Sequence, residues 1–494
     1  MQTKFSDLIG YEIYPTSFKD ANGDGIGDLP GIIEKLDYVR YLGFNAIWFN
    51  PFYVSPFKDG GYDVEDFFDV DPKFGTLKDF DQLVAKAHSL GIRVILDLVA
   101  GHASFQNKDF LRSAEPARNE MSDLFIWNEN VWVQEEGLRL ISGMFQRHGC
   151  YMVNFFAHQP AFNYGFKRVD HPKWQMSYKD ERTLQARNYL LDIMRFWLSR
   201  GADGFRVDMA DSLVKNDDDK SATIEVWQWL FERIRKEFPD AYFVSEWSNP
   251  NQALKAGFDA DFVLDHWDNF YHRFFRSDAS SRGTSVLNGA DADFAVKDLK
   301  ERYAAANKYH RSLSLISGNH DTWRIANYLD DRQLRLFYLM ILTLPGTPFI
   351  LYGDELAMKT SNLPSKDGGF QRTGTRIPML WNDEEKHGFT VNDEPYLPFF
   401  EENRVSAESA MRNKRSLLHY IRRLIKLRHE LPDLREARMT VRDDHRVLTF
   451  SRGDYRLIIN LSQENRTLTG KVIISSAPVR DGILTPGSGA LCRI

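Results

Sequence analysis

The sequence predicts an α/β fold: a (β/α)8 TIM barrel with an inserted subdomain and a small C-terminal antiparallel β domain. Three observations support this prediction. Apolar strand-like segments alternate with amphipathic helical segments through most of the chain. One long stretch interrupts the alternation after the third strand, and the last part of the chain changes to short, closely spaced strands. At 494 residues the chain has room for one large domain with smaller ones attached.

Eight segments have the length and apolar composition of buried parallel strands, and eight strands close this type of barrel. They cover residues 8–15, 44–49, 92–99, 203–207, 241–245, 260–264, 312–316 and 347–352. Segments with a helical pattern of apolar residues lie between them, and we expect these to cover the outside of the barrel. They cover residues 31–42, 77–90, 224–238, 295–307 and 332–344, and a last helix over 406–428 closes the barrel.

Residues 103–174 show no clear helical period and are rich in Trp, Phe, His and Asn. Because a structureless loop of this length is uncommon inside a compact domain, we interpret them as a subdomain inserted after the third strand. Residues 1–102 and 175–430 then form the two parts of the barrel. Residues 431–494 form the C-terminal β domain, with strands expected at 446–450, 455–460 and 471–474.

The composition argues against a nucleic-acid-binding protein and against a membrane-spanning protein. A net charge of -6 without a basic stripe argues against a nucleic-acid-binding surface. No apolar run is long enough to span a membrane, and no apolar signal region follows Met1. We therefore expect a cytoplasmic protein, unless a secretion signal has been removed, and we expect a monomer. Cys150 and Cys492 are the only cysteines and imply neither a disulfide framework nor a thiolate metal site.

Charged residues follow the apolar strands at the end of the barrel where such folds carry their active sites. Strand four carries Arg206 and Asp208, which share one face because they are two residues apart. A guanidinium beside a carboxylate lowers the pKa of the carboxyl group and keeps it ionised, as a carboxylate nucleophile requires. A salt bridge at the rim is the alternative explanation of this pair. The ends of the other strands supply Asp97, His102, Glu246, His320 and Asp321.

These residues fit glycoside cleavage, which needs one carboxylate as nucleophile and another as acid/base across the scissile bond. Glu246 follows an apolar strand and is the candidate general acid. His102 and His320 can donate hydrogen bonds to sugar hydroxyls, although a histidine taken alone is more often structural. A single aspartate at a strand end is usually a helix cap, but four such strand ends on one rim favour an active site.

Residues 20–28 have the composition of the first half of a calcium loop, with oxygen side chains at alternate positions and glycines for a sharp turn. The closing glutamate of an EF-hand is absent because Gly31 stands at that position, but Asp28 could close a shorter loop. A solvated turn is the alternative. We expect a structural Ca²⁺ or Mg²⁺ here that the chemistry does not need. Its expected ligands are Asp20, Asn22, Asp24, Ile26 and Asp28.

Taken together, the strand-end segments resemble the α-amylase superfamily of retaining glycoside hydrolases over nearly the whole chain. The matching segments are 97–102, 204–208, 244–246 and 319–321, with 159–163, 346–348 and 353–355 in support. The resemblance implies that Asp208 is the nucleophile, Glu246 the acid/base and Asp321 the third carboxylate, which holds hydroxyls of the distorted sugar. It also implies an oligosaccharide substrate and a subsite that holds the glucose unit to be cleaved from it. That subsite is lined by Asp97, His102, Arg206 and His320, with Tyr62 stacked beneath the sugar.

The finer resemblance is to the oligo-1,6-glucosidase and α-glucosidase branch. Residues 22–29 are similar to the cation loop of that branch. Asp59 and Arg376 match a pair that clamps the terminal glucose, which would favour cutting at the non-reducing end. A surface ion pair is the alternative explanation of these two residues.

Three positions depart from the pattern of this branch. Gly101 stands where many relatives have an asparagine that binds calcium between barrel and subdomain, which puts a second metal site in doubt. Met209, directly after the nucleophile, matches neither the valine typical of α-1,6 specialists nor the alanine or threonine common in α-1,4 enzymes. Phe162 replaces a usual leucine. The linkage preference therefore stays open.

The resulting prediction is a retaining exo-α-glucosidase that acts on malto- or isomalto-oligosaccharides through a β-glucosyl intermediate on Asp208. The alternatives are an endo-acting α-amylase and a transglycosylase or sucrose- or trehalose-isomerising enzyme that uses the same intermediate. A catalytically inert carbohydrate-binding relative is disfavoured, because such proteins lose the carboxylates and this chain keeps all three.

Overall fold

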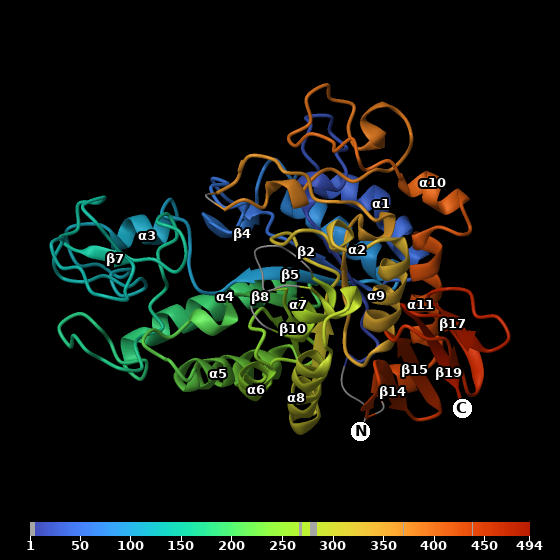
Figure 1. Ribbon diagram of the computed structural model, residues 1–494. Coiled ribbons are helices and arrows are strands. Elements are labelled where there is room, and N and C mark those ends of the chain that lie inside the picture. The colour runs from blue at the N-terminus through green and yellow to red at the C-terminus, as the bar shows by residue number, and fades with distance from the viewer. Residues whose placement is uncertain (1–4, 266–268, 277–283, 369, 437) are drawn as a thin grey trace.

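The computed structural model describes residues 5–265, 269–276, 284–368, 370–436 and 438–494, and its centre is a parallel eight-stranded barrel (Figure 1). The strands are β1 (Gly10–Ile13), β2 (Ala46–Phe49), β5 (Arg93–Val99), β8 (Gly204–Asp208), β9 (Tyr242–Ser245), β10 (Ala260–Val263), β11 (Ser312–Leu315) and β12 (Phe349–Leu351). They pair in the order β11-β10-β9-β8-β5-β2-β1-β12. A parallel bridge between Ile316 and Phe349 closes the first strand of this row onto the last. The predicted barrel is confirmed, and each expected strand overlaps one of the eight.

Helices cover the outside of the barrel. They are α1 (Leu29–Leu42), α2 (Leu77–Ser89), α4 (Leu184–Ser199), α5 (Ser221–Glu237), α6 (Pro250–Ala256), α8 (Asp293–Tyr309), α9 (Asp331–Thr343) and α11 (Leu417–Glu430). Local capping explains where several begin. The Asp28 carboxylate caps α1 by accepting the N–H of Gly31, and Thr76 and Asp330 form capping boxes at the starts of α2 and α9.

The last predicted helix is wrong in one respect, because residues 406–428 form two helices, α10 (Ala407–Arg412) and α11. Asn413 leaves the helical conformation with ψ of 98°, and the Ser416 hydroxyl starts a new helix by accepting the N–H of His419. Three further helices, α4, α6 and the short α7 (Phe270–Phe275), were not predicted.

The glycine at the start of β8 determines how closely β8 and β9 approach each other. A Cβ atom on Gly204 would lie 2.0 Å from the carbonyl oxygen of Tyr242 in β9. Only a residue without a side chain fits there. The two strands carry Asp208 and lead into Glu246, so this close approach brings the two candidate catalytic carboxyl groups to neighbouring positions.

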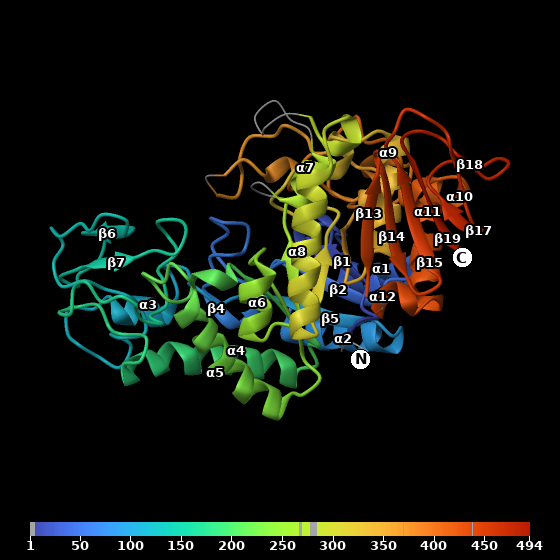
Figure 2. The same cartoon turned by 60° about the horizontal axis from the view of Figure 1, so that its bottom comes forward.

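The segment between β5 and α4 forms a loop-rich subdomain that contains α3 (Lys108–Ser113), β6 (Leu140–Ser142) and β7 (Cys150–Met152). A separate cluster of apolar side chains, including Ile126, Met152 and Phe166, forms its interior. It projects from one side of the barrel, and the C-terminal sheet lies on the other side (Figures 1 and 2). A short hairpin of β3 (Tyr53–Val54) and β4 (Asp66–Val70) carries the loop with Asp59 and Tyr62.

The C-terminal region is an antiparallel sheet of five strands in the order β13-β14-β15-β19-β17. Its elements are α12 (Asp433–Glu436), β13 (Thr440–Asp444), β14 (Val447–Arg452), β15 (Tyr455–Asn460), β17 (Lys471–Ser475) and β19 (Ser488–Arg493), with a small pair β16 (Arg466–Thr467) and β18 (Ile483–Leu484). The fully buried Arg428 of α11 donates hydrogen bonds to the carbonyl oxygens of Leu342 and Leu344 at the end of α9. The predicted antiparallel domain is confirmed, but β13 and β19 were not expected.

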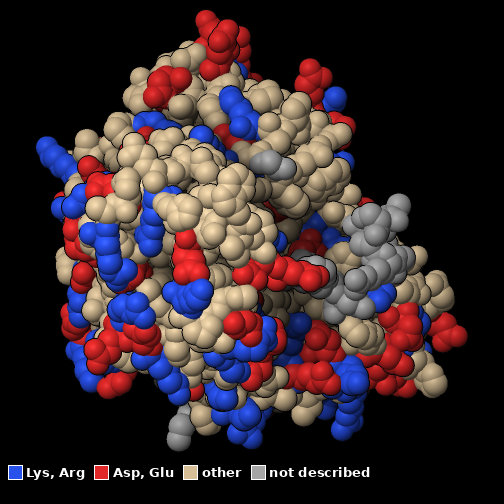
Figure 3. Space-filling model, turned by 90° about the vertical axis from the view of Figure 1, so that its left-hand side faces the viewer, with Lys and Arg blue, Asp and Glu red and all other residues tan. Residues whose placement is uncertain are grey.

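The surface shown in Figure 3 carries acidic and basic side chains interspersed, with no continuous basic stripe on that face. Among the described residues, every helix is too short or too polar to cross a membrane. The two cysteines are both buried and unpaired with each other.

Candidate active site

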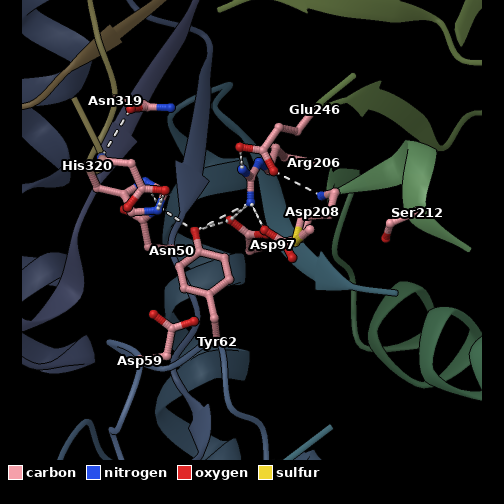
Figure 4. A network of polar contacts seen from close by, with 12 residues as sticks. Asn50, Asp59, Tyr62, Asp97, Arg206, Asp208, Ser212, Glu246, Asn319 and His320 are labelled. Carbon is pink, nitrogen blue, oxygen red and sulfur yellow. Dashed lines mark hydrogen bonds and ion pairs between the residues drawn. The ribbon is translucent and has the colours of Figure 1, made fainter. Parts of the chain in front are cut away.

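Arg206 is the centre of the candidate site, near the C-terminal end of β8 (Figure 4). Its side chain is 1% exposed and contacts three carboxylates. Nη1 donates to Asp97 Oδ1 at 2.7 Å and to Asp208 Oδ1 at 3.1 Å. Nη2 lies 2.6 Å from Glu246 Oε1. One guanidinium therefore fixes three carboxylates from adjacent strands relative to one another.

Glu246 directly follows β9 and reaches the site from the strand next to Asp208. Its Oε2 accepts a hydrogen bond of 2.9 Å from the backbone N–H of Met209. The side chains of Glu246 and Asp208 are 17% and 9% exposed, whereas the Asp97 side chain is fully buried. The structure thus holds two carboxyl groups close to each other and accessible to a ligand, as a nucleophile and its acid/base partner require.

The sequence prediction that Arg206 holds the pKa of Asp208 below its usual value is wrong. Burial raises the pKa of Asp208 well above the ordinary value, and the nearby Glu246 carboxylate raises it further; Arg206 offsets only part of this. The physical reason is that the carboxyl group is buried and that the single positive charge of Arg206 is shared among three carboxylates. The ligand-free site therefore favours holding a proton among them, and a retaining mechanism starts with one carboxyl protonated and one ionised.

Asp97 organises the aromatic side of the site. Its Oδ2 accepts hydrogen bonds from the indole N–H of Trp48 at 3.1 Å and from the hydroxyl of Tyr62 at 2.9 Å. The Tyr62 ring lies parallel to the imidazole of His320, with ring centres 5.2 Å apart and an angle of 8° between the planes. In this structure Asp97 contacts protein side chains, and it fixes Tyr62 and Arg206 relative to each other.

His102 lies at the site with both ring nitrogens occupied by protein groups. Nε2 lies 3.1 Å from the carbonyl oxygen of Tyr62, and the Asn154 amide lies 3.2 Å from Nδ1. Burial lowers the pKa of His102 to about 3, so the ring is neutral, with Nε2–H donating and Nδ1 accepting. The expected hydrogen bond from His102 to a sugar hydroxyl would have to replace one of these contacts.

Asp321 is held by two arginines from the loop after β12. Its Oδ1 accepts hydrogen bonds from Arg372 Nη1 at 2.9 Å and from Arg376 Nη2 at 2.8 Å. Burial raises the pKa of Asp321, but His320, Arg376 and Arg206 lower it, and the net effect is a pKa below the ordinary value. Asp321 is therefore ionised, which suits a group that accepts hydrogen bonds from sugar hydroxyls.

In the described part of the chain no ion pair joins Asp59 to Arg376, the two residues expected to clamp the terminal glucose, and the clamp itself stays a prediction. Asp59 forms its ion pair with Arg372, and its Oδ2 accepts a hydrogen bond of 2.6 Å from the amide of Gln159. Arg376 instead donates to Asp321 and, through Nε, to the carbonyl oxygen of His320 at 3.0 Å. Arg372 stands one helical turn earlier in the same loop, and it bridges Asp59 and Asp321 because it contacts both.

Sequence reasoning missed several residues that contact the predicted ones. Glu12 and Asn50 are polar residues in or directly after buried strands, which was an available signal. Nothing in the sequence around Arg372 indicated that it, and not Arg376, pairs with Asp59, because only tertiary contacts distinguish the two arginines. The missed residues are Glu12, Tyr14, Trp48, Asn50, Asn154 and Arg372.

The match to known proteins agrees with this geometry. Residues 12–437 match the family model of the alpha amylase catalytic domain, which covers most of the chain. The chain belongs to the alpha-amylase family. Maltase A2 of Drosophila melanogaster is 28% identical over 464 residues, which cover 85% of this chain and 78% of the relative. The trehalose synthase/amylase TreS of Mycobacterium tuberculosis is 29% identical over 478 residues, which cover 87% and 76%.

A crystal structure of a trehalulose synthase superposes with a TM-score of 0.82 and 25% identity, covering 99% of this chain and 100% of that one. An α-glucosidase of Apis mellifera is 28% identical over 522 residues, which cover 93% of this chain and 86% of the relative. As a member of the alpha-amylase family the protein is a glycoside hydrolase that acts on O-glycosyl bonds, of the α-glucosidase/α-amylase type.

Lys215 lies at the junction of barrel and subdomain, close to Gly101. Its ammonium donates to Asn154 Oδ1 and to the carbonyl oxygen of Ser212, both at 2.6 Å. Asn154 fills the space next to Gly101, since a Cβ there would lie 2.5 Å from its Nδ2. Burial lowers the pKa of Lys215 to about 7. The protein's own amine therefore lies at this junction.

The predicted cation loop has the right donor chemistry, but its oxygens bond to the backbone. Asp20 accepts the N–H groups of Gly23 at 2.7 Å and Gly25 at 2.9 Å. Asp28 accepts the N–H of Asn22 at 3.1 Å besides capping α1. In the part of the chain that the structure describes, no group of three or more His, Cys, Asp or Glu side chains is arranged to hold a metal ion. The loop oxygens keep further lone pairs, so we retain the cation as a proposal.

When Ca²⁺ is added back to protein that has been treated with a chelator, the melting temperature is expected to rise by several degrees. The reason is that the ion binds the loop in the folded protein and not in the unfolded chain. Asp24→Asn removes one ligand charge and should abolish the shift. Asp69→Asn, at an exposed position of β4, is the matched control and should keep it. Differential scanning calorimetry with and without Ca²⁺ or Mg²⁺ measures this. Equal melting temperatures in chelator and in either cation would contradict the proposal.

Proposed function

We propose that the protein is a retaining exo-α-glucosidase for short malto- or isomalto-oligosaccharides. Glu246 protonates the glycosidic oxygen while Asp208 attacks the anomeric carbon, which gives a β-glucosyl ester and releases the rest of the chain. Glu246 then takes a proton from water, which attacks the ester and releases α-glucose. The proposal is supported by the contact of both carboxyl groups with Arg206 and by the opening of both toward a ligand.

The observation that carries the exo preference is the ion pair between Asp59 and Arg372. The two residues are 3% and 6% exposed, and Arg372 also contacts Asp321. This bridge joins the hairpin loop after β3 to the loop after β12. Because this bridge lies beside Asp321, it limits how many sugar units can extend beyond the subsite that holds the cleaved glucose. We infer that only a terminal glucose fits, and that cleavage starts at the non-reducing end.

A second candidate is the same intermediate captured by a sugar hydroxyl instead of water. It is favoured by the similarity to TreS and to the trehalulose synthase, whose names state synthase activities. The first half-reaction and its residues are the same in both candidates. The two differ in the acceptor, so the products decide between them.

The first experiment is a time course with maltose, isomaltose, sucrose, trehalose and maltoheptaose, with products separated by chromatography. We expect glucose released one unit at a time from maltoheptaose, and from one of the disaccharides. A rearranged disaccharide at constant total hexose would favour the second candidate. Mixed oligosaccharides early in the maltoheptaose reaction would contradict exo cleavage.

The Arg372→Gln variant tests the bridge in the same assay. Without its charge the two loops are no longer joined, so maltose and maltotriose are expected among the early products of maltoheptaose. Arg335→Gln is the matched control, because that arginine pairs with Asp331 on α9, in a different part of the fold. It should leave the product pattern unchanged.

A further inference from the structure

Glu12 is a buried carboxylate of β1 that the two-step reaction does not use. It is 1% exposed, and its Oε1 lies 2.8 Å from His320 Nδ1, 3.3 Å from the backbone nitrogen of His320 and 3.2 Å from the amide nitrogen of Asn50. Within the described residues Oε2 has no hydrogen-bond partner, and the imidazole of His320 is the basic side chain in contact with this carboxylate. A buried carboxylate placed in this way needs an explanation, because desolvating the charge costs several kcal/mol unless it is matched.

His320 is fixed in one orientation by its neighbours. Its ring lies parallel to Tyr62 on one face, at 5.2 Å and 8°, and to Tyr14 at 6.2 Å and 17°. The indole of Trp48 approaches at 6.0 Å and 75°. A ring stacked in this way is held against rotation about its side-chain bonds. The positions of its two nitrogens are therefore fixed.

The two nitrogens of His320 face two different carboxylates. Nδ1 faces Glu12, and Nε2 lies 3.4 Å from Asp321 Oδ2, without a hydrogen bond in the described part of the chain. The Asn50 amide also lies 2.8 Å from Nδ1, but its hydrogens can be directed to Glu12 and to the Tyr62 hydroxyl, each at 3.2 Å. Two carboxylates on opposite sides of an imidazole favour a hydrogen on both nitrogens.

An uncharged amide at position 12 could accept the same three hydrogen bonds with its oxygen. What the carboxylate adds is a negative charge next to Nδ1. We propose that Glu12 is a positioning residue that acts through His320: it keeps hydrogens on both ring nitrogens and directs Nε2–H at Asp321 and at the sugar hydroxyl beside it. The inference rests on the proposed function for the role of the sugar, but its structural part concerns the free protein.

The role of this hydrogen bond follows from the charge of the transition state. Hydrogen bonds to sugar hydroxyls strengthen as the ring approaches the oxocarbenium ion. A donor that is held and charged stabilises the transition state more than the bound substrate, so its loss should lower kcat more than it raises KM.

Glu12→Gln tests this role, because it keeps the shape and removes the charge. We expect kcat on the preferred glucoside to fall about 10- to 100-fold, the range for one hydrogen bond to a charged group. KM should change less than about threefold. Introducing Glu12→Gln into the His320→Gln variant should cause no further loss, because Glu12 then has no ring to act through. Glu34→Gln, an exposed position on α1, is the control and should retain full activity.

Two results would overturn the proposal. An additive loss in the double variant would mean that Glu12 acts independently of His320. An unchanged kcat in Glu12→Gln with an unchanged melting temperature would mean that its charge has no role.

Nitrogen-15 NMR of the histidine rings tests the structural part without any substrate. The signals of His320 are those that disappear in His320→Gln. We expect two protonated ring nitrogens in the wild-type protein at pH 7 and one in Glu12→Gln. A wild-type His320 with a single ring hydrogen would overturn the proposal even where Glu12→Gln does not fold. Because this readout needs no turnover, a failure of the proposed glucosidase activity leaves it interpretable.

Discussion

Asp208→Asn is expected to lower kcat on the preferred glucoside by roughly 10⁴-fold or more, because an amide cannot form the glycosyl ester. Its oxygen can still accept the hydrogen bond from Arg206, so the site should keep its shape. The fold should not be destabilised. A carboxyl group whose pKa is raised by folding makes the protein less stable above the pKa of the unfolded chain, so removing it should not lower the melting temperature at pH 7.

The matched control is Asp211→Asn, three residues further along the chain, where the carboxylate pairs with Lys220 at 3.1 Å. It should retain activity within about threefold. A second measurement uses a fluorinated glucosyl substrate whose ester hydrolyses slowly, followed by mass spectrometry of the digested protein. The sugar should be found on the peptide that contains Asp208. A sugar on a different peptide, or Asp208→Asn with near wild-type turnover, would refute the assignment of the nucleophile.

Much of the barrel could be predicted from the sequence because its strands are short segments rich in apolar residues that alternate with helical segments. Segments 92–99 and 203–207 were both expected as strands, and both formed there as β5 and β8. The helices were harder to predict. A helical pattern continues through residues 406–428, and only the local competition of Asn413 and Ser416 for backbone groups divides it in two.

The site residues at the strand ends could also be predicted, because the C-terminal ends of all the parallel strands lie on the same rim of the barrel. Arg206, Asp208 and Glu246 come together for this reason. The loop contacts could not be predicted. Asp59 and its partner are more than 300 positions apart, and Arg372 and Arg376 are equivalent choices until the loop after β12 is folded.

The pKa of Asp208 shows a different limit of sequence reasoning. The pair Arg206 and Asp208 can be read from the chain, and taken alone it implies a lowered pKa. The result has the opposite sign because Asp97 and Glu246 share the same guanidinium, and because the group is buried. The pKa of a carboxyl group at such a site depends on how many positive and negative groups surround it in the folded protein. Residue spacing along one strand does not give that number.

Arg206→Lys is expected to cause the second largest loss, roughly 10³-fold in kcat, although the charge is kept. The guanidinium reaches Asp97 and Asp208 with one nitrogen and Glu246 with the other. A lysine ammonium is a single compact charge, and it cannot hold all three carboxylates in the same geometry. At least one buried carboxylate loses its partner, which also lowers the melting temperature.

Steady-state kinetics and calorimetry of Arg206→Lys measure the two effects together. Arg200→Lys is the matched control, since Arg200 forms a partly exposed ion pair with Asp81 at 2.9 Å and should tolerate the change. A crystal structure of Arg206→Lys should show Asp208 and Glu246 displaced from each other. If kcat stays within tenfold of the wild-type value while the control behaves as expected, the two nitrogens of Arg206 do not hold the catalytic carboxyl groups in place. The backbone of β8 and β9 must then position these groups.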